Sequence, residues 1–174
     1  MTRQNASAPP ADGAFVISRV FDAPRELVWK VCSEPEHMGR WFGPVGCVGR
    51  VVKMDFRPGG IYHFCLTFPG GMEMWARFVY LEIVPTEKIV YLHSFSDEKG
   101  GLSRHSMSPV WPLEILSTLT LTESAGKTTL TIHWTPYKAT DEERKAFGTS
   151  HGDMRQGWGG TLDRLAEYLL RFRA

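Results

Sequence analysis

The stretch that most constrains the fold is the last one, residues 153–172, which reads DMRQGWGGTLDRLAEYLLRF. Its apolar residues recur at steps of three or four positions, which is the repeat of one face of an α-helix. They are Met154, Trp158, Leu162, Leu165, Leu169 and Phe172. At helical rise such a stretch is a rod about 30 Å long, the width of a small domain. The rest of the chain must therefore supply a surface on which this face lies.

The same stretch contains three residues that disfavour a helix, Gly157, Gly159 and Gly160. Each costs about 1 kcal/mol relative to alanine inside a helix. Either the helix begins near Gly160, or another part of the chain packs against the bare backbone beside Trp158. In the second case we expect Trp158 to be mostly buried, and Arg155 and Arg171 to be exposed.

The region before this helix predicts strands separated by short turns. Strands are predicted at residues 14–21, 48–56, 61–68, 72–84, 88–95, 112–122 and 127–135. Gly, Pro, Asp and Ser mark the boundaries, and the short connections favour antiparallel neighbours. Helical segments are predicted from Pro24 to about Ser33, at 35–39 and at 141–147.

These elements predict an α+β fold, a curved antiparallel sheet of about seven strands around a long C-terminal helix, with one or two short helices after the first strand. We expect a single domain at residues 14–174, preceded by a polar, proline-rich disordered tail at 1–13. Alternation places Leu119, Leu121, Leu130, Ile132 and Trp134 on one apolar face. The irregular segment at residues 96–111 is long for a compact domain and suggests a lid.

Composition argues against several classes of partner. The formal net charge is +1 without a basic run, which argues against nucleic acid. No apolar run reaches the roughly 18 residues that a membrane span needs. Three cysteines without zinc-like spacing or a secretory signal favour reduced thiols in a cytoplasmic protein. We therefore expect no metal, no cofactor, no nucleic acid and no membrane partner.

Six short motifs together resemble a known family. They are FDAPRELVWKV at 21–31, EPEHMGRWFGP at 34–44, DFRPGG at 55–60, LEIVPTEKIVY at 81–91, TTLTIHWTPY at 128–137 and HGDMRQGWGGTLDRLAEYL at 151–169. In this order they resemble the START-like (SRPBCC) helix-grip superfamily, and within it the group related to the C-terminal domain of the activator of the heat-shock protein 90 ATPase. The resemblance runs from Phe15 to Phe172.

The resemblance implies a sheet that grips the last helix, with a cavity between them. It does not imply one chemistry, because helix-grip relatives include lipid carriers, hormone receptors, aromatase/cyclase-type enzymes and chaperone cofactors. We expect a small apolar or aromatic ligand in the cavity, and a monomer or homodimer. The expected ligand-binding residues are Trp41, Phe42, Phe56, Trp75, His93, Phe95, Trp134, Met154, Trp158 and Leu162. The competing interpretation is that the same side chains simply fill the core.

Two further hypotheses compete with ligand binding. The family resemblance suggests a chaperone partner, as a regulator of a chaperone ATPase in the stress response. The third hypothesis is a cyclase- or hydrolase-type enzyme acting on an aromatic or polyketide-like substrate. It would use His93 or a buried acid as the proton-transfer group. His93 shares the parity of Tyr91 and Phe95 and is the best inward polar candidate, whereas His133 points outward. We assign no catalytic residue, because the sequence shows no nucleophile beside an oriented base.

Overall fold

The computed structural model describes residues 13–173, so most of the predicted tail lies outside the described residues. The elements in chain order are β1 (Phe15–Phe21), α1 (Arg25–Ser33), α2 (Pro35–Trp41), β2 (Val48–Met54), β3 (Ile61–Thr67), β4 (Glu73–Val84), β5 (Lys88–Ser96), β6 (Leu102–Ser103), β7 (Glu114–Ser124), β8 (Lys127–Tyr137), α3 (Asp141–Thr149), α4 (His151–Leu169) and a 3₁₀ turn at Leu170–Phe172. The predicted α+β class is confirmed.

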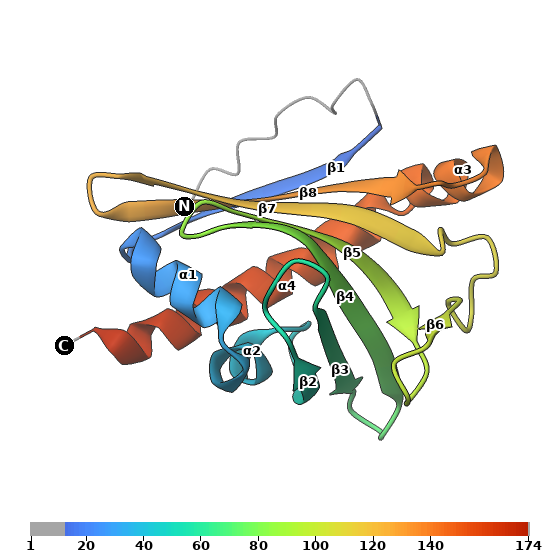
Figure 1. The fold of residues 1–174 in the computed structure, drawn as a ribbon, viewed down its shortest axis with the longest axis horizontal. Coiled ribbons are helices and arrows are strands. Elements are labelled where there is room, and N and C mark those ends of the chain that lie inside the picture. The colour runs from blue at the N-terminus through green and yellow to red at the C-terminus, as the bar shows by residue number, and fades with distance from the viewer. Residues whose placement is uncertain (1–12, 174) are drawn as a thin grey trace.

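One antiparallel sheet contains all the described strands, in the order β1-β8-β7-β5-β4-β3-β2, and the two-residue strand β6 pairs with β5. Every predicted strand is present, and β6 adds one within the segment predicted as a loop. In Figure 1 the sheet curves, and α1, α2 and α4 lie together on its concave side, with α4 running across the strands. This sheet is the surface that the last helix requires.

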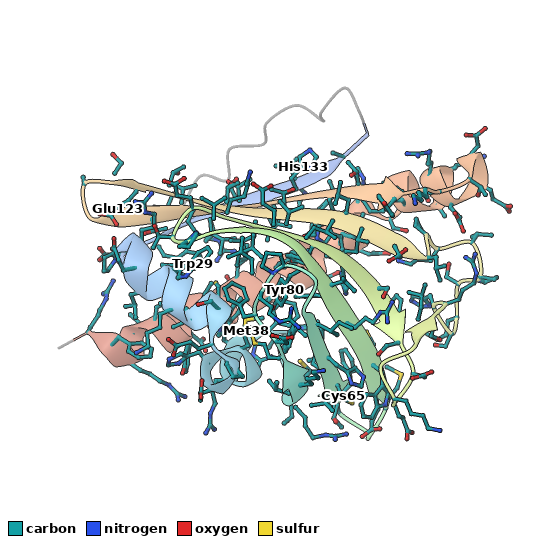
Figure 2. The ribbon with its side chains drawn as sticks, in the orientation of Figure 1. Trp29, Met38, Cys65, Tyr80, Glu123 and His133 are labelled. Atoms are coloured by element: carbon teal, nitrogen blue, oxygen red, sulfur yellow. The ribbon has the colours of Figure 1, made fainter. Side chains whose placement is uncertain are left out.

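Alternation along the strands separates a buried concave face from a convex one. Leu130 and Ile132 are fully buried, and the adjacent Thr129 and Thr131 are half-buried. Figure 2 shows His133 on the outer side of β8, as its parity predicts. The concave side chains form one continuous core with α1, α2 and α4.

Helix α4 begins at His151 and runs through all three glycines, so the alternative of a start near Gly160 is wrong. Trp158 is buried, with 8% of its surface exposed, whereas Arg155 and Arg171 are exposed as predicted. A Cβ on Gly160 would lie 3.2 Å from Val45 Cγ2. The close approach to a bare backbone therefore concerns Gly160, where the segment after α2 crosses the helix.

Candidate functional site

A cavity lies on the concave side of the sheet, beneath α4. The sheet lines it with Phe78, Tyr80, Ile89, Tyr91, Leu119, Leu130 and Ile132. The helices and the segment after α2 line it with Cys32, Met38, Trp41, Phe42, Trp158 and Leu162. The volume open to the centre of a water molecule is about 20 Å³, room for about one water. The cavity implied by the family resemblance is therefore almost filled by side chains.

Phe42 is one of the side chains that line this space, and its ring contacts both the sheet and α4. Its ring packs edge-on against Phe64, Phe78 and Trp158, with ring centroids 5.4, 5.6 and 6.0 Å away. Phe42 nevertheless remains half-buried rather than enclosed. Its neighbour Trp41 is more firmly fixed, because it is buried and its Nε1 donates a hydrogen bond to the Val31 carbonyl at 2.9 Å. Phe42 is thus the element of the wall best able to move.

Arg164 of α4 donates hydrogen bonds to the segment that carries Phe42. The Arg164 guanidinium donates to the carbonyl oxygens of Gly43 and Pro44, each at 3.1 Å, and to Cys47 Sγ at 3.2 Å. Gly43 has φ +117, a left-handed conformation that favours glycine. A Cβ at Gly43 would also crowd Cys47 Sγ, at 2.6 Å. We call residues 42–47 the plug segment. It has a glycine directly after Phe42, and it is hydrogen-bonded to the Arg164 guanidinium of α4.

The polar groups of the cavity wall are uncharged. Burial raises the pKa of the Cys32 thiol to about 12, and it raises the pKa values of Tyr80 and Tyr91 above their usual range. None of the residues described as lining the cavity is an acid, a lysine, an arginine or a histidine. The cavity can therefore form neutral hydrogen bonds but has no counter-ion for a charged ligand.

Beyond Trp158, toward the start of α4, side chains form a continuous series of aromatic contacts. We call it the ring cluster; its members are Phe15, His93, Phe95, His105, Trp111, Trp134, Phe147 and His151. Successive ring centroids lie 4.7 to 6.5 Å apart where the rings of different elements meet. An Arg104–Glu143 ion pair of 2.9 Å joins the segment after β6 to α3 beside it. The predicted lid is thus tied to α3 by a salt bridge.

The three histidines of the ring cluster are held in the neutral state by burial. Burial lowers the pKa of His93 to about 4, and it also lowers the pKa values of His105 and His151. The His93 Nδ1 and His151 Nε2 atoms are enclosed and have no hydrogen-bond partner among the described residues. His93 contacts Trp134 and Phe78, so it faces the concave side as its parity predicts.

Of the ten residues expected from the sequence, some line the cavity, some belong to the ring cluster and the others lie outside both. Trp41, Phe42, Trp158 and Leu162 line the cavity. His93, Phe95 and Trp134 belong to the ring cluster, and Met154 lies half-buried on α4 one turn before Trp158. Phe56 and Trp75 lie outside both. Phe56 packs against Tyr80 at 5.0 Å and Trp29 at 5.9 Å, and Trp75 lies on the convex face with His63 and Arg50.

Phe78, Tyr80 and Tyr91 line the cavity although the sequence reasoning did not select them. Alternation could have found them, because Phe78 and Tyr80 share one face of β4, and Tyr80 pairs directly with Tyr91 of β5. The helix residues Cys32 and Met38 carry no comparable signal. Their contribution depends on how α1 and α2 pack over the sheet.

Within residues 13–173, no group of three His, Cys, Asp or Glu side chains is placed to hold a metal ion, and the three cysteines are free and buried. In the same part of the chain, no helix combines the length and apolar character that crossing a membrane requires. The candidate site is therefore the cavity and the plug segment.

Comparison with known families agrees with this architecture. The family model described as activator of Hsp90 ATPase homolog 1-like protein matches residues 22–170. The chain belongs to this family. The resemblance drawn from the sequence motifs is thereby confirmed, and the match spans α1, the plug segment, strands β2 to β8 and α4. No curated protein matches the chain.

Solved structures support the same fold. A crystal structure of a Chromobacterium violaceum protein has 27% identity, covering 89% of this chain and 95% of that one, with a TM-score of 0.65. An Arthrobacter aurescens protein has 22% identity and a TM-score of 0.77, covering 92% and 87%. A Silicibacter pomeroyi protein titled AHSA1 has 15% identity and a TM-score of 0.68, covering 92% and 99%. At 22% and 15% identity, the last two are evidence of the fold alone.

Proposed function

We propose that this member of the family binds a small apolar or aromatic molecule in the cavity between α4 and the sheet. The observation that carries the proposal is the wall of the cavity, which is apolar or aromatic apart from neutral Tyr and Cys groups. Such walls are typical of small-molecule sites, in which a few polar groups orient the ligand.

Ligand entry requires Phe42 to leave the cavity. A space of about 20 Å³ holds no organic molecule, whereas apolar cavities on the order of 150 Å³ can bind a ring the size of benzene. Phe42 lines the cavity, is half-buried, and precedes a glycine of left-handed conformation. Rotation of the plug segment would exchange the Phe42 ring for a ligand ring of similar size.

A matched pair of filling variants tests this proposal. Leu119→Phe adds a ring inside the cavity, and Leu116→Phe makes the same change on the opposite face of β7. We expect saturable binding of para-cresol to the wild type and to Leu116→Phe in calorimetry, and its loss in Leu119→Phe. Circular dichroism verifies that both variants are folded. If the wild type binds no neutral single-ring probe and native mass spectrometry of the purified protein finds no bound molecule, the proposal is refuted.

A second candidate function is regulation of an Hsp90-type ATPase, which the family match favours. It predicts that the purified protein changes the steady-state ATPase rate of the Hsp90 chaperone from the same organism and co-elutes with it. An unchanged rate together with separate elution would remove this candidate. The test is independent of the cavity variants, because a chaperone would contact the outer surface.

A further inference from the structure

The position of Tyr80 in the cavity wall is determined by the chain on both sides of its strand. The β4–β5 register shifts between Tyr80 and Glu82, and irregularities of this kind redirect side chains. The backbone of Tyr80 is also held by the turn at 57–60, since the Gly59 N–H donates to the Tyr80 carbonyl at 2.8 Å and the Tyr80 N–H donates to the Gly60 carbonyl at 3.0 Å.

The turn itself can be built only with glycine at position 60. A Cβ on Gly60 would overlap the Asp55 carbonyl oxygen. The ring of Phe56 then packs edge-on against Tyr80 at 5.0 Å from outside the cavity. The DFRPGG motif therefore holds the backbone and one side of the ring of Tyr80. Figure 2 shows Tyr80 and Met38 in the space between the sheet and the helices.

The hydroxyl group of Tyr80 is available to a ligand. Tyr91 pairs with Ser117, whose hydroxyl accepts a hydrogen bond from Trp134 Nε1 at 2.8 Å, so polar groups lie beside the Tyr91 hydroxyl. No side-chain hydrogen bond among the described residues involves the Tyr80 hydroxyl. The titratable groups that influence Tyr80 are the hydroxyls of Tyr62 and Tyr91 and the thiol of Cys32. Burial raises the pKa of each of them, so all are neutral near pH 7. Tyr80 thus offers one neutral hydrogen bond in an uncharged wall.

We propose that the ligand of this cavity is an uncharged aromatic or apolar molecule with one oxygen, a hydroxyl or a carbonyl, that hydrogen-bonds to the Tyr80 hydroxyl. This inference rests on the proposed function and adds the chemical class of the ligand and the residue that selects it. Carboxylates and amines are excluded, because burying a charge without a partner is far more costly than forming one neutral hydrogen bond offsets.

Three single-ring probes separate the requirements for a ring, an oxygen and neutrality. They are para-cresol, its isostere para-xylene, and para-toluate, each titrated into the wild type, Tyr80→Phe and Tyr137→Phe. Tyr137→Phe is the control, because it removes the same oxygen from a tyrosine outside the cavity wall. We expect Tyr80→Phe to weaken para-cresol about 3- to 10-fold, the usual effect of one neutral hydrogen bond, and to leave para-xylene unchanged. Tyr137→Phe should change neither.

The pH dependence of para-toluate tests the exclusion of charge. At pH 7.5 only on the order of one in 1,000 molecules of a carboxylic acid with a pKa near 4.3 is neutral. We therefore expect para-toluate to bind about 1,000-fold more weakly than its neutral form, and its affinity to rise about tenfold for each unit of pH lowered. A pH-independent affinity would overturn the exclusion of charged ligands.

The possible outcomes distinguish this inference from the proposed function. If para-cresol and para-xylene both bind the wild type and Tyr80→Phe with an unchanged affinity ratio, the cavity binds ligands but Tyr80 does not select them, and the inference is wrong. If neither probe binds the wild type, the proposed function and the inference both fail. A para-cresol affinity that drops only in Tyr80→Phe supports both.

Discussion

Two regions beneath α4, the cavity at one end and the ring cluster at the other, are both lined with aromatic rings. They differ in how those rings are held. At the ring cluster, rings from six parts of the chain contact one another, and three histidines lie among them. At the cavity, one phenylalanine from the plug segment lines the space, and the surrounding wall has no histidine among the described residues. Trp158 separates the two ends, because its ring contacts both Phe42 and Trp134.

The difference shows which end can exchange its contents. Removing a ring from the ring cluster would break contacts on two sides and expose enclosed histidine nitrogens. Moving Phe42 would break its contacts with five rings, but Phe42 is half-buried and its segment has a glycine of positive φ and is hydrogen-bonded to α4 through one arginine. Under the proposed function we therefore expect ligand exchange at the cavity and structural cohesion at the ring cluster.

The largest expected effect comes from removing the boundary between the two ends. Trp158→Ala should destabilise the protein by about 3–5 kcal/mol, the usual cost of truncating a buried aromatic side chain. Chemical denaturation measures this loss. Trp75→Ala is the matched control, because Trp75 is half-buried on the convex face. Equal losses of stability in the two variants would contradict the role of Trp158 as the boundary between the cavity and the ring cluster.

The second prediction separates the two ends by pH. The folded-state pKa of His93 is about 4, against about 6.5 for an unfolded histidine. On acidification the unfolded state therefore binds the proton first, and stability falls as pH drops from about 6.5 toward 4. Between pH 7 and 5 the contribution of His93 is about 2 kcal/mol.

Two variants isolate this contribution in denaturation curves recorded at pH 7 and pH 5. His93→Leu should lose about 2 kcal/mol less than the wild type over this range. Tyr80→Phe, at the cavity end, should lose as much as the wild type, because its hydroxyl does not titrate there. His105 and His151 act in the same direction as His93 and remain in both variants. An unchanged pH dependence in His93→Leu would show that the imidazole is not buried in its neutral form.

The third prediction loosens the cavity end only. Arg164→Met removes the donors to Gly43 and Pro44 but keeps the length of the side chain. Because the guanidinium is partly exposed, the expected loss of stability is about 1–2 kcal/mol. We expect faster amide exchange at residues 42–47 and faster association of para-cresol in stopped-flow measurements. Arg171→Met, on the exposed side of the C-terminal turn, is the control. Unchanged amide exchange in Arg164→Met would mean that the Arg164 hydrogen bonds do not restrain the plug segment.

Most of the fold could be predicted because it follows from local patterns. The spacing of apolar residues predicted the last helix, and the turn residues separated the strands, with β6 missed because two residues carry no periodicity. Pro24 and Pro35 marked the starts of α1 and α2, where a missing N–H costs nothing. These signals lie within a few residues of one another, so the sequence displays them directly.

The candidate site could be predicted only in part, because it depends on contacts between distant segments. Trp75 shares the face of β4 that carries Glu73 and Arg77, and the structure puts this face on the convex side, away from the cavity. The opposite parity, shared by Phe78 and Tyr80, would have named residues of the wall. Which rings Phe42 contacts could not be predicted, since this depends on how the plug segment, β3, β4 and α4 pack together.

The smallest expected effect distinguishes the glycines of α4 from one another. A Cβ at Gly157 or Gly159 would meet no described atom within 4 Å. Alanine at either position should therefore stabilise the helix by about 0.5–1 kcal/mol, since glycine is the poorer helix former. At Gly160 the new Cβ would lie 3.2 Å from Val45 Cγ2, so the plug segment must shift by a few tenths of an ångström.

We therefore expect Gly160→Ala to leave stability nearly unchanged, because the gain in helix propensity is offset by displacement of the plug segment. Denaturation curves for the three alanine variants measure this ranking, with Gly157→Ala and Gly159→Ala as the matched controls. Because Val45 is exposed, the plug segment can move outward and take Phe42 with it. Gly160→Ala should then bind para-cresol more readily than the two controls. Equal stabilisation and equal affinity in all three variants would show that the plug segment is not held closely against α4.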